Sequence, residues 1–97
     1  MAKVELLINR EDEQAYGFLC PGCGCTHIFW TRCAKGPVWK WNGDFERPTI
    51  HPSLVYFGGK PNENRCHSFV TNGQIQFLDD CSHELRGKTV DLPELED

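Results

Sequence analysis

Short apolar runs alternate with breaks rich in glycine, proline and asparagine, a pattern typical of β-strands joined by turns. Several runs carry β-branched or aromatic residues, which favour strands over helices. The runs predict strands at residues 4–8, 16–19, 26–30, 38–41, 53–57, 66–71, 74–78 and 89–92. Asp79 and Asp80 can cap one helical turn that ends before Gly87, and a polar loop is expected from Gly58 to Arg65. We therefore predict a mainly β fold of short antiparallel hairpins, with room for one helical turn.

The clearest hairpin spans residues 66–78, because Asn72 and Gly73 form a dipeptide typical of two-residue turns. With these two residues in the loop, the strand positions opposite each other follow from the antiparallel register. The predicted cross-strand pairs are Val70 with Ile75 and Ser68 with Phe77. Since successive strand residues face opposite sides, Cys66 shares a face with Val70, and His67 lies on the other face.

The size and composition of the chain predict a single globular domain over residues 1–97. Hydrophobic residues make up 39% of the 97 residues and charged residues 25%. No apolar run approaches the roughly 20 residues of a membrane span, and the first ten residues lack the apolar run of a signal peptide. We therefore expect a cytoplasmic protein without a membrane partner. The formal net charge of −4 argues against nucleic acid as a partner.

Six cysteines in a protein expected in the reducing cytoplasm favour metal binding over disulfides. Cys20 and Cys23 enclose Pro-Gly, and a two-residue gap lets both thiolates reach one ion from a tight turn. Gly24 allows a positive φ, so that backbone N–H groups can point at the sulfurs. A redox-active dithiol would instead need a helix after Cys20, whereas a β-rich segment follows. The pattern predicts a zinc knuckle and, together with the predicted hairpins, a small β domain similar to a zinc ribbon.

A closed zinc site needs four ligands, so a second pair must come from later in the chain. The candidates are Cys66, His67, Cys81 and His83. Cys66 and His67 cannot both be ligands from a regular strand, although they could be if Cys66 precedes the strand. We rank Cys66 first and Cys81 second, and leave His67 and His83 as competitors for any remaining place.

The remaining cysteines and histidines have simpler interpretations. Cys25 and Cys33 lack a partner at ligand spacing, and buried free cysteine is an ordinary small hydrophobic residue. We interpret both as non-ligands. A second, more open metal site that uses His27, His67 or His83 is a minor hypothesis.

Several motifs together resemble a known group of proteins. They are Cys20-Pro-Gly-Cys-Gly, Trp41-Asn-Gly-Asp, Arg47-Pro-Thr, Pro52-Ser-Leu, Cys66-His-Ser-Phe-Val, Asn72-Gly-Gln-Ile-Gln-Phe-Leu-Asp-Asp-Cys-Ser-His and Gly87-Lys-Thr-Val-Asp-Leu-Pro. From about residue 18 to residue 94 the chain resembles a family of small bacteriophage and prophage zinc-knuckle proteins of unknown function, some of which are labelled ammonia monooxygenase. A more distant group with a similar knuckle and Cys-Ser-His hairpin is associated with bacterial ubiquitin-like operons. The resemblance implies metal binding and a phage setting, and no particular activity.

Three functions are compatible with these patterns. In the leading hypothesis, zinc stabilises a β scaffold whose exposed face binds a host or phage protein in the host cytoplasm. In the second, three protein ligands leave a metal position open for water, and Glu84 or Asp80 serves as general base of a zinc-dependent hydrolase. The motifs of helical metalloproteases and of zinc deaminases are absent, so we lean against catalysis. In the third, a zinc ribbon binds nucleic acid, which the net charge opposes.

Overall fold

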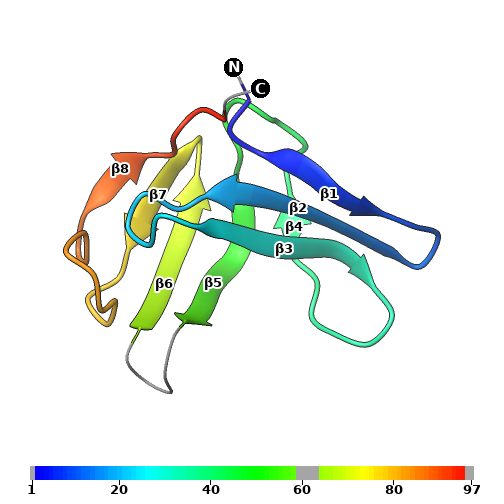
Figure 1. Ribbon diagram of the computed structural model, residues 1–97. Coiled ribbons are helices and arrows are strands. Elements are labelled where there is room, and N and C mark those ends of the chain that lie inside the picture. The colour runs from blue at the N-terminus through cyan, green and yellow to red at the C-terminus, as the bar shows by residue number, and fades with distance from the viewer. Residues whose placement is uncertain (1, 59–63, 96–97) are drawn as a thin grey trace.

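The computed structural model describes residues 2–58 and 64–95, and this part of the chain contains β-strands and no helix. The strands form two antiparallel sheets (Figure 1). Their bounds are β1 (Glu5–Asn9), β2 (Glu13–Leu19), β3 (Thr26–Cys33), β4 (Lys40–Trp41), β5 (Ile50–Gly58), β6 (Asn64–Thr71), β7 (Gln74–Phe77) and β8 (Thr89–Asp91). The predicted mainly β class is confirmed. The predicted loop 58–65 falls largely outside the described residues.

One sheet has three strands in the order β1-β2-β3, and the other has five in the order β4-β5-β6-β7-β8. Figure 1 shows the smaller sheet lying across one face of the larger sheet. The core lies between them, where Phe18 and Phe29 of the smaller sheet meet Leu54, Val70 and Phe77 of the larger one. All five side chains are buried. The other face of the five-stranded sheet is left uncovered by the three-stranded sheet.

The hairpin of β6 and β7 has the predicted register. Val70 pairs with Ile75 and Ser68 pairs with Phe77 across a turn in which Asn72 and Gly73 both have positive φ. Cys66 is buried on the core face, whereas the neighbouring His67 lies on the opposite face and is partly exposed. Period-2 alternation thus assigns two adjacent residues to two different environments.

The segment after β7 forms consecutive turns instead of the helical turn that the sequence allowed. The Arg86 N–H donates to the His83 carbonyl at 3.2 Å, and the Lys88 N–H donates to the Leu85 carbonyl at 3.0 Å. The Leu78 N–H bonds to the His67 carbonyl at 2.9 Å, which ties the start of this segment to β6. The turns bring residues 80–83 back against β6.

Strand β5 contains a bulge in its pairing with β6, and its other neighbour, β4, is only two residues long. Its pairing with β6 shifts between Ile50 and Leu54, so a bulge precedes the regular register of residues 54–58. On its other side β4 pairs only with Ile50 and His51. A bulge redirects the side chains at its end, and here it ends at Ser53.

Over the described ranges, no helix is long and apolar enough to span a membrane.

Candidate active site and metal centre

Three polar side chains form a connected chain on the uncovered face of the five-stranded sheet. Ser53 Oγ lies 3.2 Å from His67 Nε2, and His67 Nδ1 lies 3.2 Å from Asp80 Oδ2. Ser53 comes from the end of the β5 bulge, His67 from β6 and Asp80 from the turn segment after β7. The order hydroxyl, imidazole, carboxylate is that of a Ser-His-Asp catalytic triad, which is recognised by geometry and not by sequence position.

The two contacts of His67 assign its proton. An ionised carboxylate can only accept hydrogen bonds, so Nδ1 carries the proton and donates it to Asp80. Nε2 is then an acceptor and can take the proton of the Ser53 hydroxyl. Arg65 Nη1 lies 3.6 Å from the same Asp80 oxygen, a contact between side chains that are nearly half exposed and hence a weak one. The tautomer therefore suits a general base directed at Ser53.

Cys81 holds the backbone of His67 from the adjacent turn. The His67 N–H donates to Cys81 Sγ at 3.2 Å, and the Cys81 thiol lies 3.1 Å from the His67 carbonyl. Because Asp80 directly precedes Cys81, the same attachment keeps the carboxylate beside the imidazole. The Cys81 thiol is thus held against the His67 backbone, and the residue packs in the buried core.

A second cluster lies on the core side of β6. The ligand atoms of Cys20, Cys23, Cys66 and His83 all lie within 4.8 Å of one another. Cys20 Sγ is 3.8 Å from Cys66 Sγ, and Cys66 Sγ is 3.6 Å from His83 Nε2. Three thiols and one imidazole at these separations are suitably placed to hold a metal ion.

The predicted knuckle forms the first half of this cluster. The Cys23 N–H points at Cys20 Sγ at 3.4 Å, and Gly24 has a φ of 72° with its N–H bonded to the Cys20 carbonyl at 2.8 Å. The hydrogen bond from Cys66 lowers the pKa of Cys20 to about 4. The same bond and burial raise the pKa of Cys66, while burial and the Cys20 charge raise the pKa of Cys23 to about 11. These side chains alone stabilise one thiolate, that of Cys20. A bound cation would also stabilise the thiolates of Cys23 and Cys66.

His83 reaches the knuckle because Gly22 leaves room for its ring. A Cβ built on Gly22 would overlap the imidazole of His83. The ring also packs edge-on against Phe77, with centroids 4.4 Å apart. The Leu85 N–H donates to His83 Nδ1 at 3.2 Å. If His83 bound a metal through Nε2, its ring proton would lie on Nδ1. Nδ1 could then no longer accept from the Leu85 N–H, which would need another acceptor.

The structure separates the predicted site residues into two groups. Cys20, Cys23, Cys66 and His83 converge on one point, whereas Cys81 and His67 lie outside that cluster. Cys66 lies inside β6 and not before it, so strand alternation keeps His67 away, as the sequence argument required. The sequence ranking placed Cys81 ahead of His83; the turn after Leu78 instead directs Cys81 at the His67 backbone.

A smaller group of metal-ligating side chains includes Cys25, which the sequence predicts to be a non-ligand. Cys23, Cys25 and His27 lie close enough to share an ion. His27 is buried and stacks on Tyr56 at a centroid distance of 3.8 Å, and its Nε2 has no hydrogen-bond partner within residues 2–58 and 64–95. Since Cys23 belongs to both groups, two ions would have to share it.

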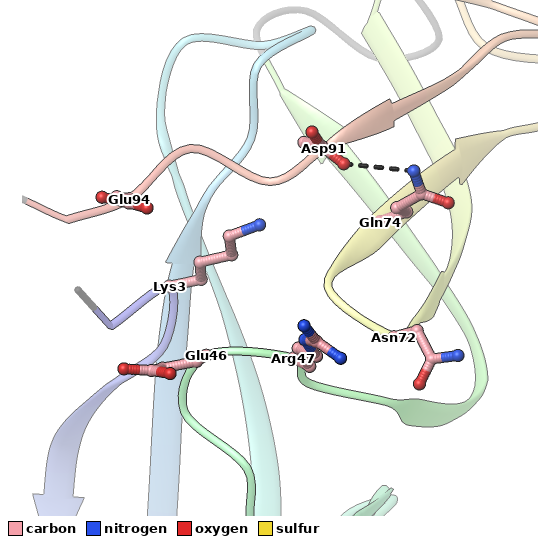
Figure 2. Close-up of a pocket in the computed structure, with 7 residues that line it drawn as sticks. All are labelled: Lys3, Glu46, Arg47, Asn72, Gln74, Asp91 and Glu94. Atoms are coloured by element: carbon pink, nitrogen blue, oxygen red, sulfur yellow. Dashed lines mark hydrogen bonds between the residues drawn. The ribbon is translucent and has the colours of Figure 1, made fainter.

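A pocket of about 320 Å³ lies apart from both clusters. The residues that line it are all polar or charged: Lys3, Glu46, Arg47, Asn72, Gln74, Asp91 and Glu94. Figure 2 shows Lys3 reaching into the space between Asp91 and Arg47, with Gln74 bonded to Asp91. None of these residues belongs to the triad or to the thiol cluster, so the pocket is separate from both.

Sequence reasoning missed Ser53 altogether and considered Asp80 only as the base of a zinc enzyme. The three triad members come from segments 14 and 13 residues apart, and no fixed spacing links them. The predicted strand faces did carry a signal for His67, because they placed its side chain on the face of the strand that does not carry Cys66. The bulge that places Ser53 next to His67 has no recognisable pattern in the sequence.

A comparison with protein-family models found a match over most of the chain. Residues 1–78 match the model of a family described as bacterial ubiquitination-like system serine protease (BubE). The matched range contains Ser53, His67 and the three clustered cysteines, and Asp80 and His83 follow just after it. No curated protein and no solved structure matches the chain. With a profile match over most of its length, the chain belongs to the family of bacterial ubiquitination-like system serine proteases.

Proposed function

We propose that the protein is a serine protease in which Ser53 is the nucleophile, His67 the general base and Asp80 the residue that orients His67. The observation that carries the proposal is the pair of 3.2 Å contacts from His67 to Ser53 and to Asp80. The family name suggests that the peptide bond to be cleaved belongs to a protein of a bacterial ubiquitination-like system.

The geometry supports the usual two-step course of acyl transfer. Ser53 Oγ attacks the scissile carbonyl while Nε2 of His67 takes the hydroxyl proton, and the imidazolium that forms is stabilised by Asp80. His67 then gives that proton to the leaving amine, which releases one product and leaves an acyl-enzyme on Ser53. Water attacks the acyl-enzyme with His67 again acting as base; His67 returns that proton to Ser53 Oγ as the ester bond breaks, which releases the carboxylic acid product and restores the free hydroxyl.

Zinc is the metal that suits the thiol cluster best. Tetrahedral zinc, bound at about 2.3 Å by sulfur and about 2.1 Å by nitrogen, separates two sulfurs by about 3.8 Å and a sulfur from a nitrogen by about 3.6 Å. The separations in the protein are 3.8 Å for Cys20 to Cys66 and 3.6 Å for Cys66 to His83. Bound zinc would stabilise the fold by joining the knuckle to β6 and to the following turns, with the triad on the other face of β6.

This arrangement fits less well with the zinc-dependent hydrolase considered from sequence. Four donors fill a tetrahedral shell, which leaves no position for a water, and Asp80 faces His67 instead of the cluster. Three expectations from the sequence stay predictions: binding of a host or phage protein, a phage origin, and binding of nucleic acid by a zinc ribbon.

The test is covalent labelling of the nucleophile. Diisopropyl fluorophosphate phosphorylates an activated serine and releases fluoride, and intact-mass spectrometry reads the adduct. We expect one adduct on the wild-type protein, mapped to Ser53, and none on Ser53→Ala or His67→Ala.

Ser68→Ala is the matched control, because Ser68 lies beside His67 on the core face of β6, is fully buried and has no hydrogen-bond partner among the described residues. It should label like the wild type. Labelling that persists in Ser53→Ala, or a folded wild type that never labels, would contradict the proposal.

A further inference from the structure

Strand β5, which carries Ser53, has an open edge. One side of β5 pairs with β6 along residues 54–58. On the other side β4 pairs with Ile50 and His51 and then ends, and among the described residues no strand continues the pairing past His51. The backbone beside the nucleophile is therefore free to pair with another chain.

The direction of the free backbone groups follows from His67, the cross-strand partner of Val55. The His67 N–H points to Cys81 Sγ and the His67 carbonyl accepts from the Leu78 N–H, so both groups face away from β5. In an antiparallel ladder, a pair without mutual hydrogen bonds directs the groups of both residues outward. The N–H and carbonyl of Val55 consequently face the open edge.

Trp39 marks where the open edge begins. Its indole Nε1 donates to the Ser53 carbonyl at 3.2 Å, so the backbone of Ser53 faces the same edge and is already engaged there. Val55 is the next residue along β5 with this orientation, and its side chain is 45% exposed on the face that carries Ser53 and His67. Two strand residues span about 6.6 Å, which places the free groups of Val55 within one substrate residue or two of the nucleophile.

We propose that the substrate binds as an extended, unstructured polypeptide segment that adds a strand to β5 at Val55. This inference rests on the proposed function of Ser53 and names how its substrate is held. Backbone hydrogen bonds to Val55 fix the register of the segment and bring one of its carbonyls to Ser53 Oγ. An apolar substrate side chain packs on Val55. A helical or folded segment lacks free backbone groups and is not cleaved.

The test separates the edge from the triad by using two substrates. Hydrolysis of p-nitrophenyl acetate needs the triad and no peptide backbone, whereas cleavage of fluorescently labelled casein, an unfolded protein, needs both. Val55→Pro removes the edge N–H without removing a bond to β6, and Val55→Ala keeps that N–H. We expect Val55→Pro to lower kcat/KM for casein by about tenfold or more, as for one lost hydrogen bond of about 1.5 kcal/mol.

The same Val55→Pro protein should hydrolyse p-nitrophenyl acetate like the wild type, and Val55→Ala should retain most casein cleavage. Unchanged casein cleavage by Val55→Pro overturns the inference, and so does an equal loss on both substrates, which would place the effect at the triad. A wild type active on the ester and inactive on casein also overturns it and leaves the triad standing. A wild type inactive on both refutes the proposed function itself.

A second measurement uses the unaltered protein, in case Val55→Pro does not fold. The peptide aldehyde acetyl-Leu-Leu-norleucinal should inhibit ester hydrolysis by adding to Ser53 Oγ, and methylation of its amide nitrogens should weaken inhibition about tenfold or more. Equal inhibition by both compounds would overturn the inference.

Discussion

The thiol of Cys81 contacts both polar backbone groups of His67, accepting from the N–H at 3.2 Å and lying 3.1 Å from the carbonyl. This pair connects the turn that carries Asp80 to the strand that carries the candidate base. Cys81 is buried, so water cannot replace the lost contacts of a truncated side chain.

Cys81→Ala should therefore lower kcat more than it raises KM, because the imidazole and the carboxylate lose their fixed separation. Cys81→Ser keeps a donor and an acceptor and should retain more activity. Metal content, measured by inductively coupled plasma mass spectrometry, should stay at the wild-type level in both variants. Loss of the metal in either variant would instead assign Cys81 to the thiol cluster.

Asp80→Asn tests the orientation of His67. An amide can donate to Nδ1 and so favours the tautomer with the proton on Nε2, which cannot accept the Ser53 proton. We expect kcat for p-nitrophenyl acetate to fall by about 10³-fold or more with little change in thermal stability, since the carboxylate is half exposed. Steady-state kinetics and a melting curve measure the two effects. An active Asp80→Asn protein would remove Asp80 from the triad.

Removal of the metal should unfold the protein and abolish labelling of Ser53 together. For small structural sites the free energy of metal binding contributes directly to folding, and this chain of 97 residues has a modest core. Circular dichroism and labelling by diisopropyl fluorophosphate during titration with a chelator should show one common transition. Activity lost before the fold would point to a metal that acts in the chemistry.

Gly22→Ala should weaken metal binding, because the new Cβ would occupy the space of the His83 ring. Competition with a chromogenic zinc chelator measures the change in affinity, which we expect to be about tenfold to 100-fold, the range seen when a site loses its alignment. Gly36→Ala is a suitable control, since its Cβ would meet only Cys33 Sγ at 3.5 Å. Equal affinities for both variants would contradict a role of His83 in the cluster.

Most of the fold could be predicted because each strand carries its own local signal. Alternating burial and the Asn72-Gly73 turn determine the β6–β7 register, and that register correctly placed Cys66 and His67 on opposite faces. The Cys20–Cys23 knuckle is equally local. The choice between Cys81 and His83 depends on the path of a turn without periodicity, and the position of Ser53 depends on a bulge. Neither has a sequence pattern, so the triad became visible only in three dimensions.

The adjacency of Cys66 and His67 has a consequence for the fidelity of folding. A slip of β6 by one residue would exchange its two faces, burying the imidazole and exposing the thiol. The Asn72-Gly73 turn fixes one end of the strand, and an ion held by Cys66 would fix the other. Only the correctly aligned strand could then bind the ion, so metal uptake would select the correctly folded protein over a misaligned one.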